Sequence, residues 1–132
     1  LSGYLALGQG LVENANNHGE QYNFGPRSEQ NHTVKDLLSD LSEYWQFKSA
    51  DEAYRVTDNI PFHEAGLLKL NCDKALFNLK WEANLNYKEC IKFVSEWYFA
   101  FYQNNKNMME LTRKQIHEYE EKATNKDLVW CK

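Results

Sequence analysis

Apolar residues recur at helical spacing in five stretches of this 132-residue chain. The clearest stretch runs from Asn31 to Trp45, and Thr33 with Asp36 resembles a capping box near its start. A full i, i+3, i+4, i+7 stripe follows, made of Val34, Leu37, Leu38, Leu41 and Trp45. The pattern predicts a helix whose stripe lies in the core.

The start of the chain also predicts a helix. Its apolar face is formed by Tyr4, Leu7 or Gly8, Leu11 and Ala15, and the polar residues 16–19 end it. The glycines at positions 3, 8 and 10 permit close packing of this helix. A Gly-x-Gly pair can also belong to a dinucleotide-binding loop, but here no strand precedes it and the third glycine is missing.

Three more helices are expected in the second half of the chain. A small helix can be capped by Asn71 or Asp73, and its apolar side is Ala75, Leu76 and Leu79. A long helix follows the cap signal of Asn86 and Glu89. Its expected buried face is Tyr87, Cys90, Ile91, Val94, Trp97, Tyr98 and Phe101. Additional aromatic residues at 93, 99 and 102 indicate that this helix packs on more than one neighbour.

The last helix is expected to start near Thr112, where Gln115 completes a capping box, and to run toward Ala123. Residues 124–132 are expected to form a mobile tail, in which the apolar residues 128–130 can dock. Short strands are expected at 20–26, 53–56 and 67–70, because these runs alternate or are apolar and end at turn residues. The fold class predicted from these patterns is mainly helical with two or three short strands, in one domain.

Composition narrows the function classes. The formal charge is −4 with scattered Lys and Arg residues, so nucleic acid is not an expected partner. No apolar run approaches the roughly 20 residues that span a bilayer, and the start lacks the pattern of a signal peptide, so we expect no membrane partner and a cytoplasmic location. The three cysteines, Cys72, Cys90 and Cys131, are widely spaced and fit neither a disulfide framework nor a zinc site. We interpret them as buried or incidental thiols.

The candidate binding residues lie in and near the stretch from Pro61 to Trp81, which joins a polar turn, a short apolar run and a helix. His63 can donate to a phosphate and Glu64 can accept from a hydroxyl, although the two can also simply cap or pair locally. Arg27 can meet a phosphate or can be a solvated loop residue. The Tyr-x-x-x-Lys spacing at 44–48 and at 102–106 matches the catalytic pair of short-chain dehydrogenases, but each match lies at a helix end and follows no glycine-rich loop. We therefore expect no catalytic residue and no metal site.

Several blocks carry a resemblance to a known family. They are Leu1-Ser-Gly-Tyr-Leu, Tyr22-Asn-Phe-Gly-Pro26, His63-Glu-Ala, Leu68-Lys-Leu-Asn, Asp73-Lys-Ala, Leu79-Lys-Trp, Glu96-Trp-Tyr and Leu111-Thr-Arg-Lys-Gln-Ile116. Together they cover most of the chain in the family's order. The chain resembles the C-terminal part of an extended short-chain dehydrogenase/reductase of the NAD-dependent epimerase/dehydratase family, which acts on nucleotide sugars.

The resemblance implies an α/β enzyme when whole, in which residues 1–132 form the substrate-side, sugar-nucleotide-binding lobe. NAD would be bound by an upstream Rossmann part that these residues do not include, and the whole enzyme would be a homo-oligomer. The blocks at 63–65 and 111–116 favour the branch that acts on CDP-glucose as a lyase, in the synthesis of surface polysaccharide. Relatives hold the nucleotide with an Arg-x-Gly-Asp turn, where Glu64 takes the place of the acid and Pro61 that of the arginine.

The 132 residues alone are expected to be inactive. Two alternatives stay open at this point. One is a standalone helical module that binds a nucleotide sugar or another partner, and the other is a different nucleotide-sugar epimerase or dehydratase.

Overall fold

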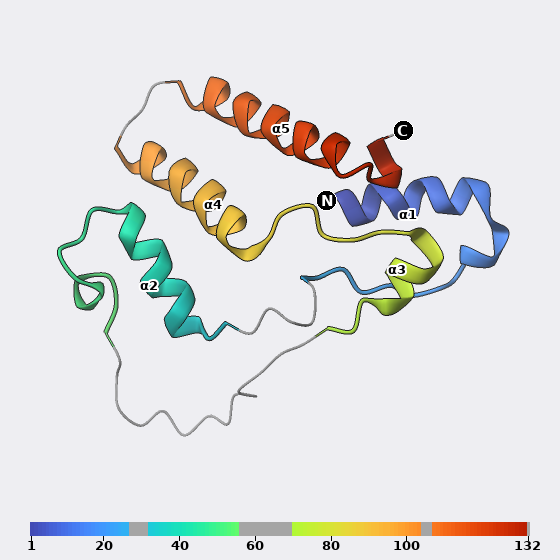
Figure 1. Ribbon diagram of the computed structural model, residues 1–132, viewed down its shortest axis with the longest axis horizontal. Helices are drawn as coiled ribbons and strands as arrows, with labels where there is room; N and C mark the ends of the chain where they lie inside the picture. The colour runs from blue at the N-terminus through green and yellow to red at the C-terminus, as the bar shows by residue number, and fades with distance from the viewer. Residues whose placement is uncertain (27–31, 56–69, 104–106, 132) are drawn as a thin grey trace. The chain divides into compact units, whose positions relative to one another are not determined.

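The computed structural model describes residues 1–26, 32–55, 70–103 and 107–131 (Figure 1). These ranges contain five α-helices: α1 (Ser2–Glu13), α2 (Val34–Tyr44), α3 (Asp73–Leu79), α4 (Tyr87–Tyr102) and α5 (Met108–Asn125). Three short 3-10 helices accompany them: η1 (Ala15–Asn17), η2 (Ala50–Glu52) and η3 (Val129–Cys131). The expectation of a mainly helical chain is confirmed.

The chain forms two compact units. The first comprises Leu1–Gln30, Lys69–Asn86 and Ile116–Lys132, and the second comprises Asn31–Leu68 and Tyr87–Gln115. Each unit therefore combines segments that are distant in the sequence.

The core of the first unit lies where α1, α3 and Trp81 meet. Its buried members are Ala6, Ala75, Leu79 and Trp81, and Leu7, Tyr22, Phe24, Ala83 and Trp130 pack against them. The indole Nε1 of Trp81 donates to Ser2 Oγ at 3.2 Å, which joins two residues 79 positions apart. Small residues on α1 permit this approach, because a Cβ on Gly3 would stand only 2.4 Å from the Phe24 ring.

The second unit is organised around α4. Helix α2 packs along it, with the Trp45 ring 6.0 Å from that of Phe99 in an edge arrangement. The first turns of α5 are tied to α4 by hydrogen bonds, in which Trp97 Nε1 donates to Thr112 Oγ1 at 2.9 Å and Gln115 Nε2 donates to the Phe93 carbonyl at 2.9 Å. The expectation that α4 packs on more than one neighbour is confirmed.

Helix ends follow local side-chain chemistry. The capping box of α2 is confirmed, since the Asp36 amide donates to Thr33 Oγ1 at 3.1 Å and the Thr33 amide donates to Asp36 Oδ2 at 2.8 Å. At α3 the N-cap residue is Cys72, and Asn71 Oδ1 accepts from the Asp73 amide at 2.8 Å. Three residues just beyond helices have positive φ without being glycine: Gln46 (59°), Lys80 (52°) and Asp127 (52°).

The predicted strands are wrong where the structure describes them. Residues 20–26 and 53–55 form no ladder with any described segment. The alternation in 20–26 arises because Tyr22 and Phe24 both turn toward the helical core, with their rings stacked at 6.5 Å. Residues 67–69 lie outside the described part of the chain, and Leu70 is irregular.

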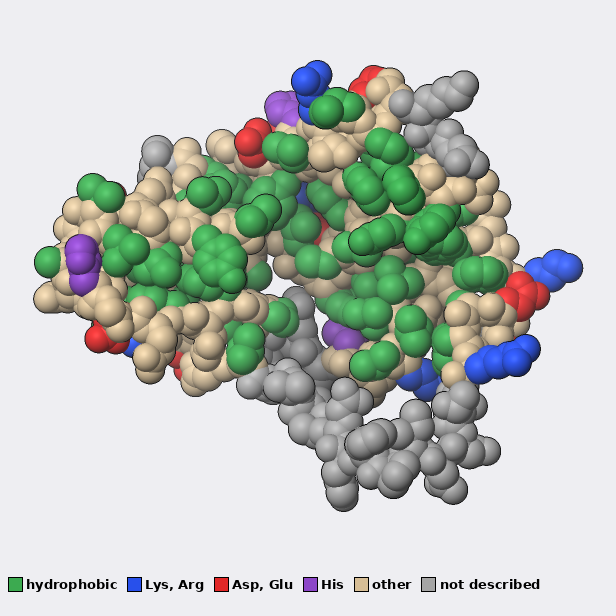
Figure 2. Space-filling model, turned by 180° about the vertical axis from the view of Figure 1, so that it is seen from behind, with side chains coloured by type: hydrophobic (Ala, Val, Ile, Leu, Met, Phe, Trp, Pro, Cys, Tyr) green, Lys and Arg blue, Asp and Glu red, His purple; other side chains and the backbone are tan. Residues whose placement is uncertain are grey.

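Several predicted helix faces also need correction. In α1 the large apolar residues Tyr4 and Leu11 are exposed, and the buried positions are Ser2, Gly3 and Ala6. The exposed members of the other predicted faces are Val34, Leu37, Leu76, Cys90, Val94, Tyr98 and Phe101. Figure 2 shows how widely hydrophobic side chains stand open on the face seen from behind. The periodicity of apolar residues identifies the apolar stripe of a helix, but it does not show whether other described residues pack on that stripe.

The end of the chain folds back on the first unit. Helix α5 starts at Met108, four residues before the expected Thr112, and Asn107 Nδ2 donates to Glu110 Oε2 at that end. Beyond α5, Leu128 is buried and Trp130 stacks on Tyr119 at 5.8 Å. The expected docking of 128 and 130 is confirmed, whereas Val129 is half exposed. The mobility of the tail stays a prediction.

Two negative observations concern the described residues alone. None of their helices is long and apolar enough to cross a membrane. They also hold no group of three His, Cys, Asp or Glu side chains with the geometry of a metal site. The three cysteines are free thiols in the structure, with Cys90 exposed and with Cys72 and Cys131 half-buried.

Candidate functional site

The three residues predicted to bind substrate, Arg27, His63 and Glu64, lie outside the described part of the chain. The structure does describe the residues that border them. Gly25 lies against the start of the α3 segment, because a Cβ built on it would stand 3.8 Å from Leu70 Cβ and 3.4 Å from Cys72 Sγ. The described ends of the two predicted ligand segments therefore meet in the first unit.

A side-chain hydrogen bond joins the same two segments. Asn23 Nδ2 donates to the carbonyl oxygen of Asn71 at 3.3 Å. The Asn71 side chain in turn accepts from Asp73 at the start of α3, so one asparagine links the helix start to the segment around Asn23. Because residues 20–26 have no ladder partner in the described chain, these contacts hold the segment in place.

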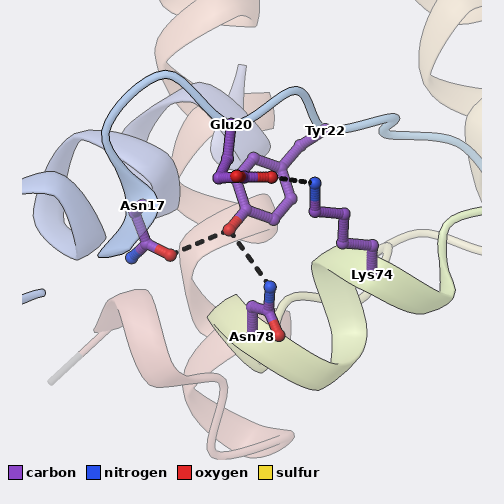
Figure 3. A network of polar contacts seen from close by, with 5 residues as sticks. All are labelled: Asn17, Glu20, Tyr22, Lys74 and Asn78. Carbon is purple, nitrogen blue, oxygen red and sulfur yellow. Dashed lines mark hydrogen bonds and ion pairs between the residues drawn. The ribbon is translucent and has the colours of Figure 1, made fainter. Parts of the chain in front are cut away.

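A polar network fixes the segment from its other end (Figure 3). The Tyr22 hydroxyl donates to Asn17 Oδ1 at 2.8 Å and accepts from Asn78 Nδ2 at 3.3 Å. Asn17 is buried, and its Nδ2 donates to the Gly10 carbonyl at 2.8 Å. One tyrosine hydroxyl thus connects η1, the 20–26 segment and α3.

Lys74 places a positive charge beside this network. Its Nζ lies 2.5 Å from Glu20 Oε2 and 5.1 Å from the centre of the Tyr22 ring. The Lys74 and Glu20 side chains are 41% and 47% exposed, so water screens the pair and its contribution to stability is small. An anion that reaches this surface can compete with Glu20 for the ammonium group.

Beside these residues lies an aromatic pocket of about 260 Å³. Its walls include Tyr4, Phe24 and Trp81, and Gly3 and Gly25 leave room between the rings. The rings pack edge to face, with centres 5.9 Å apart for Tyr4 and Phe24 and 4.9 Å apart for Phe24 and Trp81. Such a pocket suits an apolar or planar group.

A second polar cluster lies in the second unit, where α2 and α4 begin. The His32 ring stacks on Tyr87 with centres 3.5 Å apart. The Tyr87 hydroxyl is buried, and no described residue gives it a hydrogen bond of good geometry. Burial, together with the neighbouring Asp40 carboxylate, raises the pKa of Tyr87 to about 12. This tyrosine stays protonated at neutral pH and is unsuited to act as a base.

The described residues do not fit NAD. Gly8 and Gly10, the Gly-x-Gly pair, lie inside α1, and no strand in the described chain leads into that helix. A dinucleotide-binding loop needs its glycines between a strand and the N-terminus of a helix. The Tyr-x-x-x-Lys spacing at 44–48 spans the end of α2, and that at 102–106 runs outside the described residues.

The geometry and the residue blocks can now be set beside known proteins. The chain is 31% identical over 121 residues to "CDP-glucose 4,6-dehydratase" of Salmonella typhimurium, an alignment that covers 90% of this chain. The chain is similar to a CDP-glucose 4,6-dehydratase. The resemblance inferred from the residue blocks is thereby confirmed. The chain spans about a third of the dehydratase, 32% of its length. No protein-family model matches the chain. No solved structure matches it either.

Sequence reasoning missed several residues that hold the site together. Asn17 was interpreted as part of a polar helix stop, but it is a buried junction between α1 and Tyr22. The pairing of Glu20 with Lys74 joins residues 54 positions apart, and no local pattern indicates it. No local pattern indicates the role of Asn17 either, because its burial depends on contacts with residues outside its own helix.

Proposed function

We propose that this chain is the C-terminal, substrate-side part of a CDP-glucose 4,6-dehydratase of the extended short-chain dehydrogenase/reductase type. The observation that carries the proposal is the similarity to the Salmonella dehydratase along 90% of the chain. The segments around residues 25 and 70, which border the three proposed ligands, meet in one unit.

The whole enzyme converts CDP-glucose to CDP-4-keto-6-deoxyglucose. The sugar loses the elements of one water molecule, so the enzyme is a hydro-lyase. NAD is recycled in each turnover and is held by the N-terminal Rossmann part. The product serves the synthesis of 3,6-dideoxyhexoses for surface polysaccharide in the cytoplasm, and the enzyme is a homo-oligomer. The 132 residues alone are inactive, because they include no catalytic constellation.

The substrate contacts assigned to this chain follow from charge. Arg27 and a protonated His63 donate to the two phosphates of the nucleotide, and Glu64 accepts from a ribose or sugar hydroxyl. Lys74 lies in the first unit, and its ion pair with Glu20 is half exposed, so its ammonium group is open to an anionic ligand. Each of these contacts is made to the bound substrate, and none takes part in bond breaking.

The assignment is tested by kinetics of the full-length enzyme. His63→Ala and Glu64→Ala should each raise KM for CDP-glucose by about tenfold, the loss expected for one hydrogen bond to a charged or polar ligand group. The matched control is His117→Ala, since His117 is exposed on α5 and pairs only with Glu121 at 3.4 Å among the contacts described. An unchanged KM in both variants would refute the assignment of these two residues.

Two measurements separate this function from its alternatives. The intact mass of the native product, captured from its source with an antibody to this chain, should lie well above 15.6 kDa. A mass near 15.6 kDa would favour a standalone binding module. Turnover of a UDP-, dTDP- or GDP-sugar in preference to CDP-glucose would identify a different epimerase or dehydratase.

A further inference from the structure

In the described part of the chain, four buried side-chain atoms have no hydrogen-bond partner: Asn84 Oδ1, the Tyr87 hydroxyl, Ser95 Oγ and Trp130 Nε1. Two of them belong to the second unit and have a local explanation. The Tyr87 hydroxyl lies beside the Asp40 carboxylate, and a serine buried in α4 can turn its hydroxyl toward the carbonyl oxygen one turn earlier. The other two, on Asn84 and Trp130, both lie in the first unit.

The side chain of Asn84 is held in one orientation. It is 1% exposed, and its Nδ2 donates to the carbonyl oxygen of Tyr119 on α5 at 2.7 Å. A carbonyl oxygen only accepts hydrogen bonds, so the NH2 end of the amide must face Tyr119 and Oδ1 must face elsewhere. The main-chain carbonyl of Asn84 also accepts from Lys126 Nζ. Asn84 therefore joins the segment before α4 to α5 and to the turn after it, while its side-chain acceptor stays buried.

Trp130 brings a buried donor to the same part of α5. Its ring stacks on that of Tyr119 with centres 5.8 Å apart, and it also packs against the core of the first unit. An indole N–H only donates, so Trp130 Nε1 needs an acceptor, whereas Asn84 Oδ1 needs a donor. Both side chains contact Tyr119, one at its carbonyl oxygen and the other at its ring. The two needs are complementary.

We propose that one buried water molecule bridges these two atoms, accepting from Trp130 Nε1 and donating to Asn84 Oδ1. Buried water binds polar groups that the protein itself leaves unsatisfied, and it needs at least two such partners. It can fill both roles at once, because its oxygen accepts while its hydrogens donate. The inference does not depend on the function proposed above, since every residue in it belongs to the first unit.

The bridge makes this water a latch for the C-terminal turn η3. The backbone hydrogen bonds of the turn are local, from the Leu128 amide to the Ala123 carbonyl at 3.1 Å and from the Cys131 amide to the Leu128 carbonyl at 3.0 Å. Such bonds shape the turn but do not attach it to segments distant in the sequence. Burial of Leu128 attaches it through apolar contact, and the water adds a polar link to Asn84.

A crystal structure of the unchanged polypeptide at its native length tests the bridge directly, at a resolution that shows ordered water. We expect one water oxygen at about 2.7–3.2 Å from both Trp130 Nε1 and Asn84 Oδ1. A direct hydrogen bond between the two side chains would overturn the proposal. Separate water molecules on the two atoms, or a protein group in the bridging position, would overturn it as well. This test needs no variant, so it does not depend on how a substitution folds.

Hydrogen exchange followed by mass spectrometry tests the latch in solution, on the same polypeptide. Trp130→Phe removes the donor and Asn84→Leu removes the acceptor. Each should speed amide exchange in residues 126–131 by about tenfold, because the turn then opens more often. The double variant should exchange no faster than Asn84→Leu alone, since both changes break one bridge. Unchanged exchange in the single variants, or a double variant that shows the product of two separate effects, would refute the latch.

Tyr119→Phe is the matched control. It keeps the ring that stacks on Trp130 and the carbonyl oxygen that accepts from Asn84, and it removes only a hydroxyl group. Exchange in residues 126–131 should therefore stay at the wild-type rate. An acceleration equal to that of Trp130→Phe would assign the effect to packing of the rings and would overturn the latch. Exchange in α4, in the second unit, should be the same in all variants and reports that each one folds.

Discussion

Two glycine-to-alanine changes in α1 should have opposite effects on stability. Gly3 and Gly8 lie five residues apart in the same helix, and each change adds the same methyl group. At Gly3 the new Cβ would stand 2.4, 2.5 and 2.9 Å from three atoms of the Phe24 ring. At Gly8 it would meet no atom within 4 Å. The comparison therefore isolates packing from helix propensity.

The magnitudes follow from these distances. Alanine in place of glycine inside a helix stabilises by up to about 1 kcal/mol, and the gain at Gly3 is smaller because it lies in the first turn. Against this, Phe24 cannot move freely, since Tyr4 and Trp81 pack on it edge to face. Overpacking at such a site costs roughly 1–3 kcal/mol. Gly3→Ala should thus destabilise by about 1–2 kcal/mol, and Gly8→Ala should stabilise by about 0.5–1 kcal/mol.

Urea unfolding of the 132-residue chain, followed by tryptophan fluorescence and by far-ultraviolet circular dichroism, measures both effects. We expect a lower midpoint for Gly3→Ala and a higher one for Gly8→Ala at an unchanged slope. Gly3→Ala with Phe24→Leu should recover part of the loss, because the shorter side chain leaves the added methyl group room. If Gly3→Ala proved as stable as Gly8→Ala, the contact of α1 with the Phe24 ring would be refuted.

Two further predictions concern the second unit. The pKa of Tyr87 is raised to about 12 in the folded chain, against 10 in the unfolded chain. The protonated tyrosine therefore contributes fully to the stability of the folded state below pH 10, and this contribution is lost as the pH rises to 12. In thermal melts, Tyr87→Phe should remove the loss of stability between pH 10 and 12. If the thermal midpoint of the variant still fell over this pH range, the loss would belong to another group. Thr33→Ala should destabilise by about 1 kcal/mol through loss of the α2 cap, with Ser39→Ala as the control on the same helix. Backbone and side-chain hydrogen bonds from Thr33 lower the pKa of Asp36, so the cap should also weaken in acid as that carboxylate gains its proton. Equal stability of Thr33→Ala and wild type near neutral pH would contradict the role of Thr33 as the cap of α2.

Local chemistry made much of the helical fold predictable. The Thr33 and Asp36 pair fixed the start of α2, because both hydrogen bonds of a capping box form within four residues. The glycines at positions 3, 8 and 10 were expected to permit close packing, and Gly3 and Gly10 do so, whereas a Cβ on Gly8 would meet nothing within 4 Å among the described residues. The alternation of apolar and polar residues around Tyr22 and Phe24 led to the wrong prediction of a strand. An extended segment that packs against helices shows the same alternation as a strand in a sheet. Pairing partners distant in the sequence decide between those two structures.

The chemistry assigned to Arg27, His63 and Glu64 stays a prediction, and the residues that hold the bordering segments together could not be predicted from the sequence. The residue types at 63 and 64 indicated a nucleotide-sugar ligand through the family resemblance, and the comparison with the Salmonella dehydratase agrees with that family. The Tyr22 hydroxyl and its two asparagine partners were not predictable, because each bond joins residues from different elements. Burial of Asn17 is a tertiary property that periodicity does not contain.

The left-handed residues that follow three of the helices have a practical consequence. Gln46, Lys80 and Asp127 each hold a conformation that costs a side-chain residue about 1 kcal/mol or more and costs glycine little. The conformational cost at each position is local, so a single substitution by glycine can remove it without moving a neighbouring helix. An engineer seeking a more stable variant would start with glycine at these three helix ends.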